Sequence, residues 1–373
     1  MLYVQDPTYT NSYSLHEALV GVCSGANSGK GAYAFVSRAG ADIFLGDVEV
    51  KGMLERGSYQ LIVGIDQITT TSTIERLVEY QDMYSSLNVS AFLHNSMNSL
   101  FHPKISFFSD NNGCGSLVIG SGNLTTGGLR KNREVFAVVS LSQQELVNIE
   151  AYWNDWVTKS ANYLKPLTDS EVLRRVAANT VRARTWKEII VPEGVPVDID
   201  ELPSDSESTE ESIEWNYQDD NLVLFAEIPK SGNRWNQANF DVTTFENFFG
   251  ATAGDNSQRI LLRYVVSDRI LGNIEIRPSV SVKSQNYRFE LEAAAGLDYP
   301  ANGRPIGIFV RLSPRMFIYK LFMPDDDKYD EILDWMNANW NDRGDRMKRI
   351  IVEAGSVASI LNQTPIHSFL VAH

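Results

Sequence analysis

Short hydrophobic runs alternate with amphipathic segments in the first half of the chain, which is the pattern of an α/β domain. The run Tyr59 to Asp66 predicts a buried strand, and a helical pattern follows from Ile74 to Tyr84. A longer helix is predicted over Gln143 to Leu164, where large apolar residues recur at helical spacing. Further strands are predicted at residues 89–94, 102–108, 115–121 and 133–141.

The second half has a different pattern, in which short β-like runs are separated by Gly, Asn and Pro turns. Such closely spaced runs predict a barrel or a half-open β domain. A helical pattern returns from Tyr329 to Leu361. The six β-like runs cover residues 221–229, 260–266, 273–282, 287–293, 306–312 and 315–322.

A segment rich in proline, serine and acidic residues, Gly194 to Glu214, lies between the two halves. Its composition is typical of an extended, self-repelling linker. We therefore expect an α/β domain over residues 1–190, an acidic linker over 191–214, a β domain over 215–345 and a C-terminal tail over 346–373.

The charge of the chain bears on its partners. The formal net charge of −14 argues at first against a nucleic-acid partner. However, the stretch from Glu193 to Glu214 contains nine acidic residues and no basic one, so it accounts for −9 of the total. The objection is therefore weaker for the two domains than for the whole chain.

The sequence lacks the patterns of an export signal, a membrane span and a zinc site. The first residues lack a secretory pattern, and no run reaches the roughly 18 apolar residues of a membrane span. Two cysteines, Cys23 and Cys114, are too few for a disulfide framework and fit a reducing cytoplasm. The five histidines are scattered, so together with the two cysteines they do not form the pattern of a four-ligand zinc site.

Two polar motifs carry the candidate chemistry. His102 and Lys104 lie two residues apart at the start of a predicted strand, so their side chains share a face. Ser121 and Asn123 repeat this spacing at the end of the next strand. Two adjacent strands can thus present an imidazole, an ammonium, a hydroxyl and an amide to one point.

These groups suit phosphodiester cleavage without a metal. A histidine such as His102 can attack phosphorus and form a phosphohistidine. Lys104, Ser121 and Asn123 can donate hydrogen bonds to the equatorial oxygens of the transition state. A carboxylate such as Glu134 can hold the imidazole in the required tautomer.

The run His102, Lys104, Gly120, Ser121, Asn123 resembles the H-x-K…G-S-x-N signature of the phospholipase D superfamily. The longer run from His102 to Glu134 is similar to the NgoFVII type of restriction endonuclease, which includes CglI and NgoAVII. The resemblance implies a phospholipase D-like α/β sandwich nuclease domain. The superfamily pattern also places an aspartate five residues after the lysine, where this chain has Ser109 followed by Asp110.

The resemblance further implies a homodimer, because a second H-x-K motif protonates the leaving oxygen in this superfamily. No other histidine of this chain is followed two residues later by lysine. The same resemblance implies a helicase-like ATPase partner subunit that would bring ATP and Mg. The Gly-rich run Ser24 to Tyr33 lacks the Walker pattern, and we interpret it as a turn before a strand.

Two segments of the second half combine lysine, arginine, amides and an aromatic residue. Arginine suits guanine, asparagine and glutamine suit adenine, and lysine suits phosphates. This resembles the β-pseudobarrel DNA-binding domain of plant transcription factors, and the resemblance implies that double-stranded DNA is read there. Arg277, Arg304, Arg311 and Arg315 are weaker candidates for backbone contacts. The candidate DNA-binding residues are Lys230, Asn233, Arg234, Trp235, Asn236, Gln237, Lys283, Gln285, Asn286 and Arg288.

Three functions therefore remain open. The first is a site-specific restriction endonuclease that hydrolyses DNA through a dimer-shared phosphohistidine site. The second is a phospholipase D-type lipid phosphodiesterase, and the third is a non-catalytic DNA-binding regulator with a vestigial nuclease fold. Cleavage assays on DNA and lipid in EDTA separate the first two, and a His102→Ala variant separates the third.

Overall fold

The computed structural model divides into two compact units. The first contains residues 1–6 and 13–204, and the second contains residues 7–12 and 205–373. The described residues are 1–66, 68–94, 99–190, 214–230, 235–252, 254–255, 257–279, 287–341 and 347–371, with backbone alone at 182–190 and 287.

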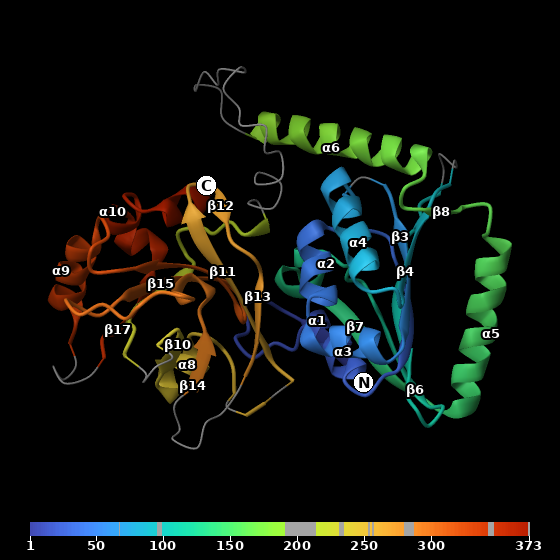
Figure 1. The fold of residues 1–373 in the computed structure, drawn as a ribbon, viewed down its shortest axis with the longest axis horizontal. Coiled ribbons are helices and arrows are strands. Elements are labelled where there is room, and N and C mark those ends of the chain that lie inside the picture. Colours follow the sequence, from blue (N-terminus) through green and yellow to red (C-terminus); the bar gives the residue numbers. More distant parts are fainter. Residues whose placement is uncertain are drawn as a thin grey trace. The chain divides into compact units, whose positions relative to one another are not determined.

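The first unit is built on an eight-stranded sheet with the order β1-β7-β6-β5-β2-β3-β4-β8 (Figure 1). The pairs β2–β3 and β3–β4 are parallel, and the other neighbours are antiparallel. The strands are β1 (Leu2–Gln5), β2 (Ser28–Tyr33), β3 (Ser58–Gly64), β4 (Leu87–Phe92), β5 (Lys104–Ser109), β6 (Gly115–Gly120), β7 (Glu134–Leu141) and β8 (Leu164–Pro166).

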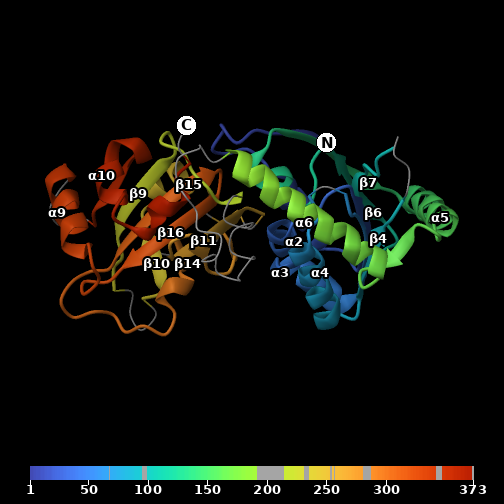
Figure 2. The same cartoon turned by 90° about the horizontal axis from the view of Figure 1, so that it is seen from above.

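Helices cover the two faces of this sheet unequally. Helices α1 to α4 lie on one face, α5 lies on the other, and α6 runs across one end of the strands (Figures 1 and 2). Only part of the second face is therefore covered. The helices are α1 (Leu15–Cys23), α2 (Arg38–Leu45), α3 (Val48–Arg56), α4 (Thr71–Met83), α5 (Gln143–Lys159) and α6 (Ser170–Ile190).

All five strands predicted for this unit are confirmed, and the predicted helix over 143–164 is α5, which ends at Lys159. Its start is set by a capping box between Ser142 and Glu145. Trp153 is buried against the sheet, where its indole ring meets the Phe107 ring edge-on at 5.5 Å. This packing explains why the aromatic residues of the helix recur at helical spacing.

The interpretation of the Gly-rich run as a turn is wrong, because most of it forms the central strand β2. Glycine is required there by its neighbours. A Cβ on Gly29 would lie 2.6 Å from the Phe108 ring, and one on Gly31 would lie 2.3 Å from the Tyr59 hydroxyl. The aromatic rings of β3 and β5 thus occupy the space that β2 side chains would otherwise fill.

The second unit contains a mixed sheet with the order β12-β11-β16-β15-β9-β17, and β13 also pairs with β11. A separate two-stranded ribbon joins β10 to β14. All six predicted β runs form strands, so the prediction of a β-rich domain is confirmed. The strands are β9 (Leu222–Glu227), β10 (Gln237–Phe240), β11 (Arg259–Ser267), β12 (Ile270–Leu271), β13 (Glu275–Pro278), β14 (Tyr287–Glu290), β15 (Ile306–Ser313), β16 (Met316–Phe322) and β17 (Arg349–Glu353).

The C-terminal residues belong to the second unit and do not form a separate tail. Strand β17 pairs with β9, and Tyr217 forms a β-bridge with Leu370. The helical pattern after Tyr329 is only partly confirmed, because α9 (Tyr329–Asn339) ends before this strand and the short α10 (Ala358–Leu361) follows it. The predicted linker lies outside the described residues apart from Glu214.

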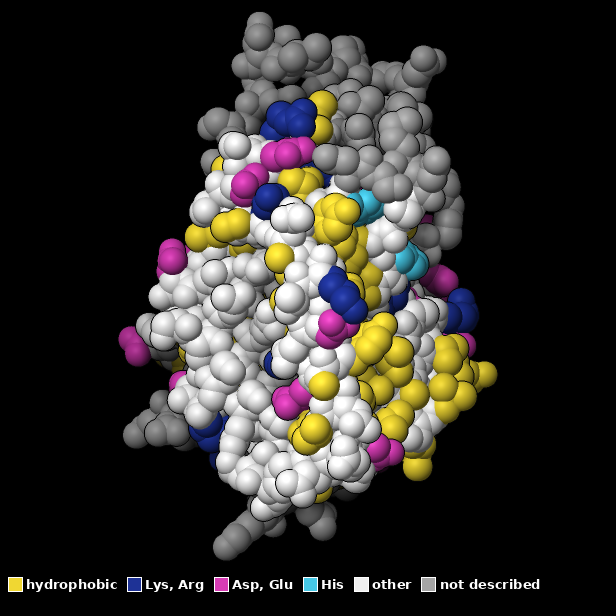
Figure 3. All heavy atoms as spheres, turned by 90° about the vertical axis from the view of Figure 1, so that its right-hand side faces the viewer, with side chains coloured by type: hydrophobic (Ala, Val, Ile, Leu, Met, Phe, Trp, Pro, Cys, Tyr) yellow, Lys and Arg dark blue, Asp and Glu magenta, His cyan; other side chains and the backbone are white. Residues whose placement is uncertain are grey.

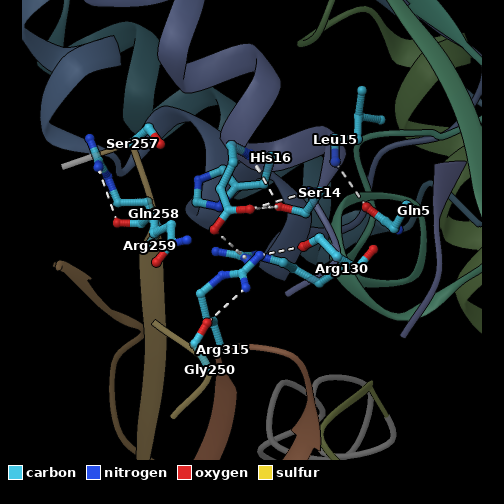
Figure 4. A network of polar contacts seen from close by, with 12 residues as sticks. Gln5, Ser14, Leu15, His16, Arg130, Gly250, Ser257, Gln258, Arg259 and Arg315 are labelled. Atoms are coloured by element: carbon cyan, nitrogen blue, oxygen red, sulfur yellow. Dashed lines mark hydrogen bonds and ion pairs between the residues drawn. The ribbon is translucent and has the colours of Figure 1, made fainter. Parts of the chain in front are cut away.

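Arg315 is a structural residue of the second unit and not an exposed cation. Its side chain is buried and donates to the carbonyl oxygens of Thr10 at 3.1 Å and Gly250 at 3.0 Å (Figure 4). The other weak candidates for backbone contacts are also engaged. Arg277 pairs with Glu275, Arg304 pairs with Glu227, and Arg311 donates to the carbonyl oxygen of Asn247.

Candidate active site

His102 and Lys104 lie together at one edge of the first sheet, as their spacing predicted. The Lys104 Nζ atom is 3.1 Å from Nδ1 and 3.0 Å from Nε2 of His102. The Ala34 amide donates to the Pro103 carbonyl at 2.8 Å, which fixes the segment beside β2. The Phe35 ring meets the imidazole edge-on with centroids 6.0 Å apart. His102 itself is exposed, so its ring can be reached from solvent.

The charge of Lys104 depends on its surroundings. Partial burial lowers the pKa of its ammonium group, and the nearby Glu134 carboxylate acts in the opposite direction. The burial effect is the larger of the two. Lys104 is therefore a cation held at some cost beside His102, which favours its pairing with an anion such as phosphate.

Ser121 and Asn123 follow β6 and reach the same edge, because β6 is the antiparallel neighbour of β5. The Ser121 hydroxyl donates to Glu134 and accepts the Val135 amide at 3.1 Å. The Asn123 Oδ1 atom accepts the Phe35 amide at 3.2 Å. This bond orients the Asn123 side chain so that its NH₂ group is the donor available to a ligand.

Glu134 does not hold the imidazole in this structure, contrary to its expected role. Its carboxylate accepts from Ser121 and from Asn132 Nδ2, the latter at 3.2 Å. No hydrogen bond between Glu134 and His102 occurs among the residues that the structure describes. The reason is topological, because β7 and β5 are separated by β6 and so lie about 10 Å apart.

The loop that carries Asn123 is firmly anchored. It contains a π-helical turn, Gly127–Lys131, whose Arg130 forms a buried ion pair with Glu17 at 3.4 Å. Gln5 Nε2 donates to the Asn132 carbonyl at 2.9 Å, and Gln5 Oε1 accepts the Leu15 amide at 2.9 Å (Figure 4). These contacts tie the loop to β1 and α1, so its donors are preorganised.

Asp110 plays a structural role at the opposite end of the β5–β6 hairpin from the active edge. Its Oδ1 atom accepts the amides of Asn112 at 2.8 Å and Cys114 at 2.9 Å. It lies six positions along the chain from Lys104, at the other end of β5, a span of roughly 20 Å. The shifted aspartate of the motif therefore stabilises a turn and does not contact the candidate site.

The described ends of the two predicted DNA-reading segments pair in the β10–β14 ribbon. The strands are antiparallel, with Gln237 opposite Glu290 and Phe240 opposite Tyr287, so β10 and β14 begin at opposite ends of the ribbon. Arg288 is exposed on β14 and lies opposite Asn239. Five of the candidate residues, Asn233, Arg234, Lys283, Gln285 and Asn286, lie outside the described residues.

The remaining candidates of the first segment differ in exposure. Lys230 is exposed, and its ammonium lies 5.9 Å from the centre of the Tyr299 ring. Asn236 is half-buried, and Gln237 donates to Glu290 at 3.0 Å. Trp235 is only 6% exposed, and its indole donates to the Leu297 carbonyl at 2.7 Å, so it belongs to the core of the unit.

A second polar cluster at the active edge was not predicted. Asp66 follows β3, His94 follows β4, and Arg175 from α6 contacts both. No sequence motif links these residues, which are up to 109 positions apart. Among the described residues, no group of three His, Cys, Asp or Glu side chains is arranged to hold a metal ion.

Comparisons with known proteins give distant structural likeness only. No family model and no curated protein matches the sequence. NucT from Helicobacter pylori is 19% identical over 44% of this chain and 96% of its own, with a TM-score of 0.32. Nuc from Salmonella typhimurium, titled a phospholipase D family member, is 15% identical with the same coverage and TM-score.

The N-terminal domain of LlaJI.R1 from Helicobacter pylori is 14% identical over 35% of this chain and 97% of its own, with a TM-score of 0.25. At such TM-scores these likenesses do not establish a function. In the described part of the chain, no helix is both long and apolar enough to cross a membrane.

Proposed function

We propose that this chain is a phosphodiesterase of the phospholipase D kind that cleaves DNA at specific sites. The observation that carries the proposal is the convergence of His102, Lys104, Ser121 and Asn123 on one sheet edge. Lys104 supplies a cation, and the Asn123 amide supplies an oriented donor. An exposed imidazole beside these groups is suited to attack a phosphodiester.

In the proposed reaction a ring nitrogen of His102 forms a bond to phosphorus while the bond to the leaving oxygen breaks. The leaving oxygen takes a proton from the imidazolium of a second His102. Water then attacks the phosphohistidine, gives its proton to that second imidazole and releases the phosphate monoester. Lys104 and Asn123 bind the phosphate oxygens in both steps, and no metal is required.

The second imidazole in this proposal comes from a second copy of the chain. An uncovered part of the sheet supports this idea. Helix α5 packs over β2, β3 and β5 through Leu146 and Trp153. Hydrophobic side chains also gather on the surface seen in Figure 3. Ile119 of β6 lies opposite Ala137, which lies opposite Leu2, so one apolar surface crosses three strands. We call this surface the bare face, and its exposed members are Leu2, Val4, Ile119, Val135 and Val139.

The bare face adjoins the candidate active site, since Ile119 is two residues from Ser121 and Val135 is next to Glu134. Its members are 41–69% exposed, which is unusual for a contiguous apolar surface of a monomer. Pairing of two such faces about a twofold axis would bury them and bring two active edges together.

We assign sequence recognition to the second unit and propose that it is a pseudobarrel that reads double-stranded DNA. The exposed Lys230 and Arg288, near the β10–β14 ribbon, support this assignment. The proposal extends to a restriction role with a helicase-like ATPase partner, as the sequence resemblance implies. In that case ATP and Mg would act through the partner.

Cleavage of plasmid and of phosphatidylcholine in EDTA tests the function. We expect His102-dependent nicking of plasmid, abolished in His102→Ala, with no lipid turnover. His367→Ala is the matched control, because it removes a histidine from the second unit and should keep full activity. Lipid turnover without nicking would support a phospholipase, and equal inactivity of wild type and His102→Ala with retained DNA binding would support a regulator.

A further inference from the structure

Asp66, His94 and Arg175 form a compact cluster at the same sheet edge as His102. The Arg175 guanidinium lies 3.5 Å from Asp66 Oδ1 and donates to the His94 carbonyl at 3.0 Å. The His94 Nε2 atom is 3.6 Å from Asp66 Oδ2 and makes no hydrogen bond to the described residues. The side chains are 12% to 26% exposed, so the cluster is partly open to solvent, although the His94 Nε2 atom itself is buried.

Helix α6 is fixed across the ends of β3 and β4, so Arg175 has a defined position. Asn179 Nδ2 donates to the carbonyl oxygens of Ile65 at 2.7 Å and Thr69 at 2.9 Å. The Thr71 amide donates to Thr180 Oγ1 at 3.1 Å. A guanidinium held in this way loses little conformational entropy when it binds an anion.

The sheet order gives the distance of this cluster from the candidate active site. β5 is followed by β2, β3 and β4, so Asp66 and His94 lie two and three strands from Lys104. At about 4.8 Å per strand, this is roughly 10–14 Å. Phe101, the residue before His102, stacks on Phe92 with centroids 4.2 Å apart and so connects the two places.

We propose that Asp66, His94 and Arg175 form a second phosphate-binding site for the DNA backbone. This proposal rests on the proposed nuclease function. Arg175 and the Nδ1 atom of His94 would donate to the phosphate oxygens, and Asp66 lies beside both side chains. Successive phosphates of one duplex strand are about 7 Å apart, because each step combines the 3.4 Å rise with a rotation about the helix axis. A separation of 10–14 Å therefore corresponds to about two steps. The site binds a phosphate about two nucleotides from the cut and helps to set the register of the DNA.

Arg175→Gln tests this site, and Arg174→Gln is the matched control. Arg174 is the neighbouring residue of α6, has the same charge and is 78% exposed, and its ion-pair partner among the described residues is Glu171. We expect Arg175→Gln to raise KM for a long duplex about tenfold and to lower the salt slope of binding by about one. Arg174→Gln should change both quantities much less, and Arg175→Lys should recover part of the loss.

Substrate length separates binding of a distant phosphate from a general defect. The effect of Arg175→Gln should be large on a duplex with ten flanking nucleotides on both sides of the cut. It should be much smaller on bis(4-nitrophenyl) phosphate, which has no neighbouring phosphate. If both substrates lose activity equally and the melting temperature falls, the cluster only fastens α6 and the proposal is wrong.

The inference remains testable if the nuclease proposal fails. Anisotropy of a labelled duplex measures binding without cleavage, so the salt slopes of wild type, Arg174→Gln and Arg175→Gln can still be compared. Absence of cleavage with a reduced slope in Arg175→Gln alone would overturn the nuclease function and keep the phosphate site. Equal slopes in all three proteins would overturn the phosphate site, whatever the outcome of the cleavage assay.

Discussion

Substitution of Ile119 by lysine should break the proposed dimer. Ile119 is 44% exposed and lies on β6 at the border of the bare face, between Ile105 of β5 and Ala137 of β7. Lysine is preferred to an acid because it does not repel DNA at the nearby active edge. Val48→Lys is the control, since Val48 is 62% exposed at the start of α3, on the opposite side of the sheet.

The expected size of the effect follows from burial and symmetry. Complete burial of an isoleucine contributes about 1.5–3 kcal/mol, so the exposed part of Ile119 would contribute about 1 kcal/mol per subunit. A partly buried ammonium costs at least about 1 kcal/mol more, even when the side chain bends toward water. A twofold interface doubles both effects to about 4 kcal/mol, which raises the dissociation constant roughly 1000-fold.

Sedimentation velocity over a range of protein concentrations, without DNA, measures this constant directly. We expect wild type and Val48→Lys to be dimers at micromolar concentration and Ile119→Lys to be a monomer. Circular dichroism must show that Ile119→Lys stays folded. The reasoning is refuted if wild type is monomeric throughout, or if both lysine variants dimerise as wild type does.

Three further predictions follow from the site. In the first, His102→Ala and wild-type subunits are mixed equally and allowed to exchange. Activity should fall to about one quarter of that of wild type at the same total concentration, because only dimers with two His102 residues react. A fall to about one half would indicate independent subunits. Burial lowers the pKa of Lys104 below 10.5, so kcat/KM should decline at an alkaline pH below that value, and Lys104→Arg should shift the decline upward because arginine stays charged. Asp110→Ala should lower the free energy of unfolding by about 1–2 kcal/mol in urea titrations, since two turn amides lose their acceptor, and should leave kcat unchanged.

The fold of the first unit was largely predictable where hydrophobic side chains make the strands. β3 and β5 show this, because Leu61 and Phe107 are buried and stand out in the sequence. β2 was missed because its glycines leave space for aromatic rings from β3 and β5. The hydrophobic side chains that pack at β2 therefore belong to the neighbouring strands and not to β2 itself. A strand of this kind cannot be found from its own hydrophobic pattern.

The parts of the candidate site that could be predicted are those whose residues lie close together in the sequence. His102 and Lys104 are two residues apart at the start of β5, and Ser121 and Asn123 directly follow β6. The pairing of two strands that are adjacent in the sequence therefore brings all four residues to the same end of the sheet. The role of Glu134 could not be predicted, because the strand order that puts β6 between β7 and β5 is a long-range property. Arg175 and His94 are 81 residues apart and meet only through the placement of α6.

The exposure of His102 gives a further reason to expect a second subunit at the site. Lys104 and Asn123 stabilise charge best when water is excluded, because electrostatic interactions are much stronger at low dielectric constant. The loop donors are already fixed by the buried pair of Arg130 and Glu17, so they need no further ordering. The imidazole and the Ser121 hydroxyl still face solvent, and Ser121 is two residues from Ile119 of the bare face. A second copy docked there would cover both groups and supply the missing acid, so the same contact would explain both the apolar surface and the single motif.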